Sequence, residues 1–354
     1  MIKISFKYII LAIFVFGFLI FIHELGHYLC ARLCKVDIKE FAIGMGPKLI
    51  SFKSKKSDTD YTEKTETMYT IRLLPLGGYV SMVGEDEESD SENAFNKKTV
   101  WQRLMIVLAG PVMNLILGVI VMTVMISSFG NLYSTTVDYR DGDTIISQNF
   151  GLCEGDKITK VGKVFVHTYN EVSYEIMRQG IEPLDITVIR NGEKIIIEDV
   201  VFPTVEAEGV LFGSVDFLPT VEEKTALNVL KHSIYRSAST VKMVVDSFVD
   251  LIRGRYGLNA MSGPVGITQT IGDYASMGLY YFLSIFVIIT INLGVFNLFP
   301  IPALDGGRLL FLLIEAIIGR PLNPKIEGYI HFAGLVLMLG LVLIVTFNDI
   351  LRLF

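Results

Sequence analysis

The chain has 354 residues, a formal net charge of −6 and a hydrophobic content of 51%. The apolar residues are pooled in long runs, whereas a soluble protein of this length would distribute them periodically. The acidic balance argues against nucleic acid as a partner, and the 3 cysteines are too few for a disulfide framework. The composition therefore predicts a protein that lies in a lipid bilayer and binds no nucleic acid.

Four apolar stretches approach or exceed the length of a transmembrane helix, which is about 20 residues. They occupy about residues 8–30, 104–129, 281–299 and 331–347, and the third continues towards residue 318. No small-residue cleavage site follows the first run, so we expect a retained helix rather than a removed signal peptide.

The distribution of Lys and Arg predicts the orientation of these helices. Positive charges are concentrated in residues 31–103 and about 314–330, and the positive-inside rule places such segments in the cytoplasm. Both termini and the middle segment, residues 131–280, would then be extracytoplasmic. Lys3 and Lys7, which precede the first run, oppose this orientation weakly.

The first cytoplasmic segment predicts a β-hairpin. Lys48–Phe52 and Met68–Leu74 have strand character, and a polar stretch joins them. The paired glycines Gly77 and Gly78 then indicate a turn or a close approach of the backbone to a neighbour. The acidic run at residues 85–90 is typical of a solvated loop.

The middle segment predicts a small α+β domain of about 70 residues. Between about Val137 and Phe202 the sequence has short strands, one helix near Tyr169–Gln179, and a hairpin with an Asn191-Gly192 turn. The following stretch, Thr225–Ile252, has apolar residues at helical spacing but too many charges to span a bilayer. We expect this helix to lie along the membrane or against the helix bundle.

The first apolar run contains the sequence HELGH, from His23 to His27. Residues four apart share one face of a helix, so His23 and His27 can bind one metal ion, while Glu24 can act on water beside it. H-E-x-x-H on a helix is the signature of zinc metalloproteases, with two ligands and a general base. Ionisable residues inside a membrane helix are costly and mark function. Sulfur ligation by Cys30 and Cys34, which lie on the same helical face as His27, is an alternative to a packing role for these cysteines.

A catalytic zinc site needs a third protein ligand. Asp305 follows a helix that Pro300 and Pro302 interrupt, and irregular backbone at membrane depth is tolerated only where protein or a wet cavity surrounds it. Asp305 is therefore the preferred candidate, and its alternative role is that of a helix cap. The other candidates are Glu40, Glu63 and Glu66.

Several motifs resemble those of a known family. HELGH and NLFPIPALDGG, the latter at residues 297–307, resemble the site-2 protease family of intramembrane zinc metalloproteases, in its bacterial regulator-of-sigma (RseP-like) branch. The supporting motifs are GMGP at 44–47, PLGGYV at 75–80, AGPVMN at 109–114, GLCEGDKI at 151–158, and Gly263-Pro264.

This resemblance implies Zn²⁺ held by His23, His27 and Asp305, with Glu24 as the general base. It also implies that Asn297, and more weakly Asn292, holds the unwound substrate backbone. GLCEGDKI is similar to a turn of the PDZ domains that these proteases carry, and the chain has room for one such domain. The implied substrates are single-pass transmembrane proteins, such as anti-sigma factors or signal-peptide remnants.

A helical substrate must unwind before cleavage, and its freed backbone groups then need new partners. We expect the hairpin strand Met68–Leu74 to supply them by strand addition, with Ile71, Gly77 and Gly78 as further candidate substrate-binding residues.

The expected fold is a polytopic α-helical membrane protein of the bacterial cell membrane, with about four transmembrane helices, a cytoplasmic membrane-associated β-hairpin and an inserted extracytoplasmic PDZ-like domain. The expected division is 1–130 and 281–354 for the catalytic membrane domain, 131–205 for the PDZ-like domain, and 206–280 for the amphipathic linker region. Two other readings stay open. Paired inverted repeats in the sequence would support an ion transporter. Loss of Glu24 would support an inactive metal-binding scaffold.

Overall fold

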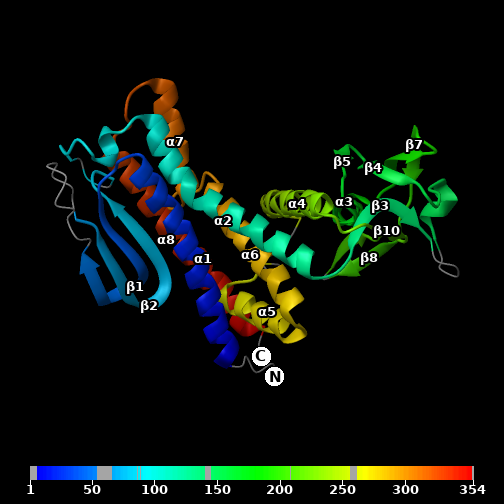
Figure 1. Ribbon diagram of the computed structural model, residues 1–354, viewed down its shortest axis with the longest axis horizontal. Helices are drawn as coiled ribbons and strands as arrows, with labels where there is room; N and C mark the ends of the chain where they lie inside the picture. The colour runs from blue at the N-terminus through cyan, green and yellow to red at the C-terminus, as the bar shows by residue number, and fades with distance from the viewer. Residues whose placement is uncertain are drawn as a thin grey trace. The chain divides into compact units, whose positions relative to one another are not determined.

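The computed structural model describes residues 6–53, 66–85, 87, 89–139, 145–207, 209–255 and 261–352. The chain forms two compact units (Figure 1). The first comprises Met1–Ile120 and Met243–Phe354, and the second comprises Val121–Lys242.

The first unit is built mainly from helices. Four helices among the described residues are long and apolar enough to cross a membrane, namely α1, α2, α6 and α8, which agrees with the prediction of a polytopic membrane protein. The bounds are α1 Phe6–Leu33, η1 Phe95–Lys97, α2 Val100–Ser128, α4 Ala226–Ile252, α5 Pro264–Met277, α6 Leu279–Leu298, α7 Asp305–Ile318 and α8 Pro324–Leu351; α2 and α4 also contribute residues to the second unit.

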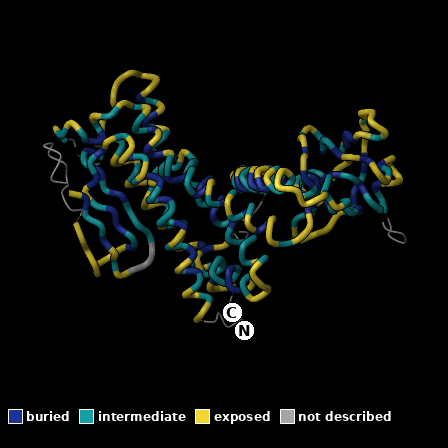
Figure 2. Tube along the Cα trace, viewed as in Figure 1, coloured by how far each residue is buried: buried dark blue, intermediate teal, exposed yellow. Residues whose placement is uncertain are grey.

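These helices are apolar and yet largely exposed. In α8 only 11% of the most hydrophobic 18-residue stretch is buried. Much of the length of the helices in this unit is exposed or half-buried (Figure 2). Apolar surface of this extent is unfavourable in water and suits contact with lipid.

Strands β1 (Ile38–Lys53) and β2 (Met68–Met82) form a curved sheet beside these helices (Figure 1). Each strand pairs twice along its length. Residues 40–43 pair with 78–81 on one side and with 68–71 on the other, and residues 68–71 also pair with 50–53. Across the sheet the order is therefore 78–82, 38–43, 68–71 and 50–53.

This pairing corrects the expected location of the free strand edge. The hairpin between Lys48–Phe52 and Met68–Leu74 forms as predicted, but residues 68–71 have a neighbour on both sides and are not an edge. Among the described residues, one free edge is instead the segment 78–82, which begins at the second of the paired glycines. The doubled pairing was missed because Gly77, with φ +86°, lets β2 change direction and continue as another strand.

The core of this region lies between the sheet and two helices. Val80 and Met82 from β2 are buried in one cluster with Ala31 of α1 and Ile106 and Val107 of α2. This packing holds the edge segment 78–82 close to the helix that carries HELGH.

The second unit is β-rich. Its main sheet has the strand order β10-β3-β4-β6-β7, β5 pairs with β4, and β8 pairs with β9 in a separate two-stranded sheet. The bounds are β3 Leu132–Asp138, η2 Ser147–Phe150, β4 Lys157–Val161, β5 Val164–Phe165, α3 Tyr169–Gln179, β6 Leu184–Arg190, β7 Glu193–Val200, β8 Thr204–Ala207, β9 Val210–Gly213 and β10 Leu218–Glu222.

The helix and the hairpin of this unit follow their sequence signals. Thr168 and Glu171 form a capping box at the start of α3. Asn191 and Gly192 both have positive φ, at 54° and 85°, as the tight turn between β6 and β7 requires. The sheet extends past the boundary expected at residue 205, because β10 pairs with β3.

Candidate metal centre and active site

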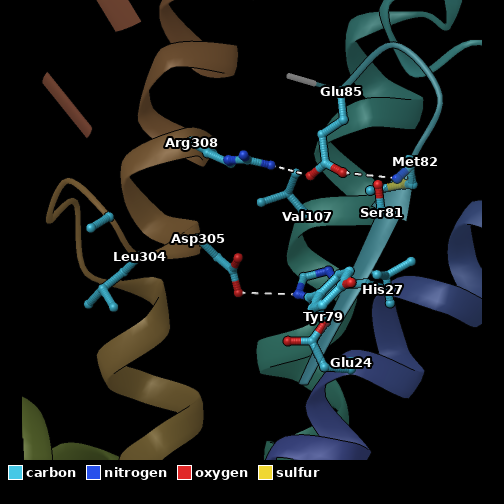
Figure 3. Close-up of a pocket in the computed structure, with 12 residues that line it drawn as sticks. Glu24, His27, Tyr79, Ser81, Met82, Glu85, Val107, Leu304, Asp305 and Arg308 are labelled. Carbon is cyan, nitrogen blue, oxygen red and sulfur yellow. Dashed lines mark hydrogen bonds and ion pairs between the residues drawn. The ribbon is translucent and has the colours of Figure 1, made fainter. Parts of the chain in front are cut away.

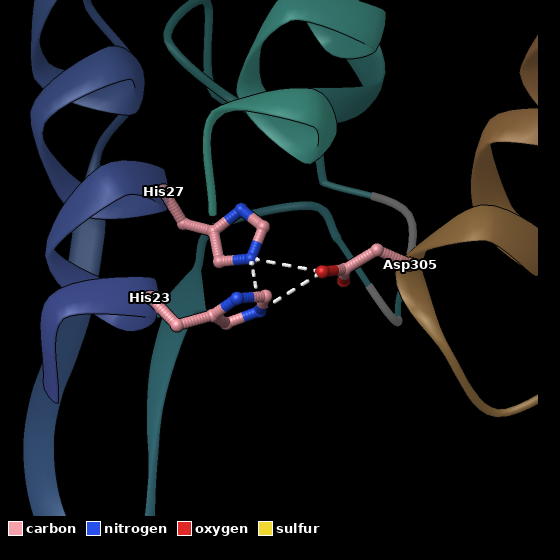
Figure 4. Close-up of side chains that lie close together, drawn as sticks. All are labelled: His23, His27 and Asp305. Carbon is pink, nitrogen blue, oxygen red and sulfur yellow. Dashed lines mark hydrogen bonds and ion pairs between the residues drawn. The ribbon is translucent and has the colours of Figure 1, made fainter. Parts of the chain in front are cut away.

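The side chains of two histidines of α1 and one aspartate of α7 lie close together (Figure 4). His23 Nε2 lies 2.9 Å from Asp305 Oδ2, and His27 Nε2 lies 3.3 Å from the same oxygen. The two Nε2 atoms are 3.2 Å apart. His23 and His27 are buried, at 7% and 8% exposure.

Asp305 is placed by the broken chain that precedes it. Pro300 and Pro302 separate α6 from α7, and Asp305 is the first residue of α7. A Cβ on Gly306 would lie 1.9 Å from the Phe299 carbonyl oxygen, so only glycine permits this fold of the chain. The two residues after Asp305 are thus glycines because the α6–α7 connection packs directly against them.

The connection is also held from α8. Ala303 adopts a left-handed conformation, with φ 75°, immediately before the aspartate turn. Its N–H donates to His331 Nδ1 of α8 at 3.0 Å. His331 thereby fixes the backbone that presents Asp305, a role that its position within an apolar run did not reveal.

His27 is oriented by the backbone of α2. Its Nδ1–H donates to the Ile106 carbonyl oxygen at 2.8 Å, which leaves Nε2 with a free lone pair. Gly110 of α2 makes room for the ring, since a Cβ there would lie 2.2 Å from His27 Nε2. The motif AGPVMN thus contacts the HELGH helix directly.

His23 has a matching neighbour on the same helix. Asn114 is fully buried, and its Nδ2 lies 3.4 Å from His23 Nδ1 while its Oδ1 has no hydrogen-bond partner among the described residues. Turning this amide over places Oδ1 where it accepts from His23 Nδ1–H and so leaves Nε2 as a ligand atom. Sequence reasoning did not single out this role, although Asn114 is a polar residue inside an apolar run.

The donor set fits a zinc ion. Once the Asn114 amide is turned in this way, both Nδ1 atoms have acceptors. Two imidazole lone pairs and a carboxylate oxygen then face one another, and such an arrangement is repulsive without a cation between them. Tetrahedral zinc with bonds of about 2.0–2.1 Å needs ligands about 3.3 Å apart, and the observed separations are 2.9, 3.2 and 3.3 Å. The cluster therefore supplies three ligands of the right type and spacing.

Asp305 supplies the carboxylate oxygen of this set. Its usual alternative role, that of a helix cap, is not seen, because Leu304 occupies the N-cap position.

The other candidate ligands lie elsewhere. Glu40 pairs with Arg72 at 3.0 Å, and Glu66 pairs with Lys53 at 3.3 Å. Glu63 lies outside the described residues. Within the described part of the chain, the one group of three or more such side chains close enough to hold a metal ion is His23, His27 and Asp305.

A cavity of about 530 Å³ adjoins this cluster (Figure 3). Glu24, His27 and Asp305 line it together with residues 79–82 of the sheet edge. Gly78 brings the edge close to the motif, since a Cβ there would lie 3.3 Å from Glu24 Cγ and 2.9 Å from the Ala42 carbonyl oxygen. The arrangement places a carboxylate, a metal site and a strand edge around one space.

The other residues predicted to bind substrate are Asn297, Asn292, Ile71 and Gly77. Asn297 donates its side-chain amide to the Leu293 carbonyl oxygen at 3.0 Å and does not line this cavity. Asn292 has a buried Oδ1 with no hydrogen-bond partner among the described residues. Ile71 belongs to the central segment of the sheet, and Gly77 packs against Met45.

Comparison with known proteins gives a match over most of the chain. The sequence profile of Peptidase family M50 matches residues 11–341. The zinc metalloprotease RasP of Geobacillus kaustophilus is 33% identical over 98% of this chain and 98% of its own length. The regulator of sigma-W protease RasP of Bacillus subtilis is 30% identical over 98% of this chain and 99% of its own.

These matches confirm the predicted class of enzyme and its zinc cofactor, which the sequence motifs and the metal-ligand geometry had indicated independently. The chain belongs to peptidase family M50.

Proposed function

We propose that the protein cleaves peptide bonds within or near the transmembrane segments of single-pass membrane proteins, as an intramembrane zinc metalloprotease of the bacterial cell membrane. The observation that carries this proposal is the convergence of His23, His27 and Asp305 beside Glu24, in a chain whose described residues include four candidate membrane spans. His23, His27 and Asp305 are assigned as ligands, and Glu24 as the general base.

Zinc, when bound, supplies the Lewis acidity that activates water and polarises the scissile carbonyl. Glu24 takes the proton from the attacking water and returns it to the leaving amine. Ile106 and Asn114 keep the two imidazoles in the tautomer that presents Nε2. Burial of the cluster excludes bulk water and strengthens each electrostatic contact.

The substrate needs an extended backbone at the cavity, because the carbonyls of a helix are already hydrogen-bonded within it. We assign the edge segment 78–82 as the strand to which the unwound substrate adds, in place of Met68–Leu74. Asn297 and Asn292 are assigned as secondary contacts on α6. Rotation of the Asn297 side chain away from the Leu293 carbonyl oxygen would free its amide for substrate.

The β-rich second unit is proposed to be a single extracytoplasmic PDZ-like domain that limits which substrates enter. This assignment rests on the GLCEGDKI turn and on the positive-inside pattern. The same charge pattern favours an extracytoplasmic position for both termini. The name of the Bacillus subtilis relative, a regulator of sigma-W protease, favours anti-sigma factors as substrates, with signal-peptide remnants as the second class.

The proposal is tested with purified full-length protein and a model transmembrane peptide. We expect about one zinc per chain and cleavage that a chelator stops and added zinc restores. An ion transporter would instead show metal-dependent flux without cleavage. An inactive scaffold would bind zinc and leave the peptide intact.

The assignment of the substrate edge has a separate test. Proline at Val80 removes a backbone N–H that points away from β1, whereas Val80→Ala removes the same side chain and keeps the N–H. We expect Val80→Pro to reduce cleavage of a stable helical substrate by more than Val80→Ala does. The difference should shrink for a substrate that already contains helix-breaking residues, and equal losses in both variants would point to lost packing.

The size-filter role of the second unit is tested by replacing residues 132–222 with a short linker. These bounds extend those expected from sequence, because β10 would otherwise lose its partner β3. The shortened protein should cleave untrimmed substrates that the intact protein rejects. If it cuts trimmed substrate normally and still rejects the untrimmed form, the unit is a spacer.

A further inference from the structure

Glu85 lies three residues after the edge segment 78–82. This segment borders the cavity of about 530 Å³ beside His27 and Asp305, here called the metal cavity. Its carboxylate accepts a hydrogen bond from the Met82 backbone N–H at 3.3 Å and forms an ion pair with Arg308 of α7 (Figure 3). The Glu85 side chain is only 12% exposed. A backbone donor on a strand edge is therefore occupied by a side chain from its own chain.

The direction of the backbone groups shows which edge this donor belongs to. Val83 N–H donates to the Asp37 carbonyl oxygen, which lies on the β1 side. Neighbouring residues of a strand point their backbone groups to opposite sides, so the groups of Gly78, Val80 and Met82 point away from β1. Met82 N–H is thus the last outward donor of the edge, and Glu85 covers it.

The second partner of Glu85 links the edge to the metal site. Arg308 lies three residues after Asp305, one turn along α7. Both members of the pair line the metal cavity, and both also line a neighbouring cavity of about 490 Å³. The Glu85–Arg308 pair therefore stands in the wall between the two cavities.

We propose that Glu85 occupies the position of a substrate carbonyl at the end of the binding edge, and that a substrate extended along the whole edge must displace it. This inference rests on the proposed function, and it assigns Glu85 and Arg308 as a pair that determines substrate selectivity. An incoming extended segment supplies its own carbonyl oxygen to Met82 N–H. Glu85 then leaves the edge while staying paired with Arg308, on the side of the neighbouring cavity.

A substrate with a short unwound segment leaves the Glu85 contact intact. A substrate that extends along the whole edge must replace a charge-assisted hydrogen bond with a neutral one, which is weaker. The pair thus disfavours segments that stay extended past Val80. We assign the pair to substrate binding rather than to the chemical step, because Glu85 accepts from the Met82 N–H of the edge and pairs with Arg308.

The experiment compares Glu85→Ala, Glu85→Gln and the matched control Glu87→Ala in the full-length protein. Glu87 is an exposed acid two residues away, so its replacement makes the same change in charge. KM and kcat are measured with a transmembrane peptide, and hydrogen exchange of the Met82 amide is measured without peptide.

We expect Glu85→Ala to lower KM on the order of threefold to tenfold, with a smaller change in kcat. Exchange at Met82 should become faster. Glu85→Gln, which keeps an acceptor oxygen but loses the charge, should fall between wild type and Glu85→Ala, and Glu87→Ala should match wild type.

An unchanged or raised KM in both Glu85 variants, with unchanged exchange at Met82, would overturn the proposal and leave Glu85 as a structural partner of Arg308. If Glu85→Ala loosens the whole sheet, with faster exchange throughout β1 and β2, the Glu85→Gln variant decides the question. Failure of the proposed function is distinct from both outcomes, because wild-type protein would then not cleave the peptide at all.

Discussion

Each unit of the protein holds an aspartate that is at least partly buried, Asp156 fully and Asp305 in part, and the two have opposite surroundings. Asp156 in the β-rich unit is fully buried and receives hydrogen bonds from Arg190 Nε at 2.7 Å, from Arg190 NH2 at 2.8 Å and from the Cys153 backbone N–H at 2.8 Å. Asp305 in the helical unit faces two imidazole nitrogens whose lone pairs point at it.

The difference separates a structural carboxylate, Asp156, from the proposed metal ligand, Asp305. Asp156 has a full set of donors from its own chain, so its charge is compensated without any ligand. Asp305, His23 and His27 bring three possible ligand atoms together, and with both Nε2 lone pairs free these atoms would repel one another unless a cation lay between them. A buried acid thus indicates a binding site when its neighbours are acceptors, and a structural contact when they are donors.

The largest expected effect comes from the base beside the metal. Glu24→Gln removes the proton carrier and keeps every proposed ligand, so cleavage should fall by about 10²–10⁴-fold while zinc content stays at the wild-type level. Peptide cleavage and metal analysis on the same preparation give both values. Turnover near the wild-type rate would exclude Glu24 as the base.

The comparison between the two aspartates predicts that the same replacement, Asp to Asn, affects zinc content at one position and not at the other. Asp305→Asn should lose most of its zinc, since an anionic ligand becomes a neutral one. Asp156→Asn should retain zinc. Metal analysis of the two variants side by side decides the point, and full zinc content in Asp305→Asn would remove Asp305 from the ligand set.

For the free energy of unfolding, we expect the larger effect at Asp156 rather than at Asp305. Asp156→Ala removes the acceptor of Arg190 Nε and of the Cys153 N–H, and loss of hydrogen bonds to a charged group costs about 1.5–3 kcal/mol. The exposed neighbour Glu154 provides the control, because Glu154→Ala changes the same charge at the surface. Hydrogen exchange of the β4 and β6 amides reports the loss, and equal protection in the two variants would contradict it.

The smallest effect is expected at the neighbour of His23. Asn114→Ala should weaken zinc binding about 10–100-fold, as loss of a residue that orients a ligand does. Asn114→Asp keeps an acceptor for His23 Nδ1–H and should restore most of the affinity. Zinc affinity by competition with a chelator measures both, and equal affinities in the two variants would show that Asn114 only fills space.

Much of this architecture follows from local sequence signals. The capping box at Thr168, the Asn191-Gly192 turn and the HELGH spacing each depend on residues a few positions apart, so the sequence shows them directly. The approach of Asp305 to HELGH was expected because few acids lie at membrane depth, and the structure brings the two together.

The remainder depends on contacts between distant segments. The central position of residues 68–71 follows from a second pairing that no local pattern shows. The same holds for the contacts of Ile106 and Asn114 with the histidines, and for the contact of His331 with Ala303, because each joins residues from different helices or loops. Unpaired polar residues in apolar runs, such as Asn114, were the available signal.

The close contact between α1 and α2 has a consequence for the behaviour of the enzyme in different membranes. A Cβ on Gly26 would lie 2.3 Å from the Ala109 carbonyl oxygen, and the next residue, Gly110, meets the ring of His27. The two helices are therefore in close contact at and beside His27. When bilayer thickness changes, helices adjust their tilt, and we expect helices in such contact to be displaced most at their ends and least at the contact. We therefore expect the metal centre to keep its geometry in thin and thick bilayers alike.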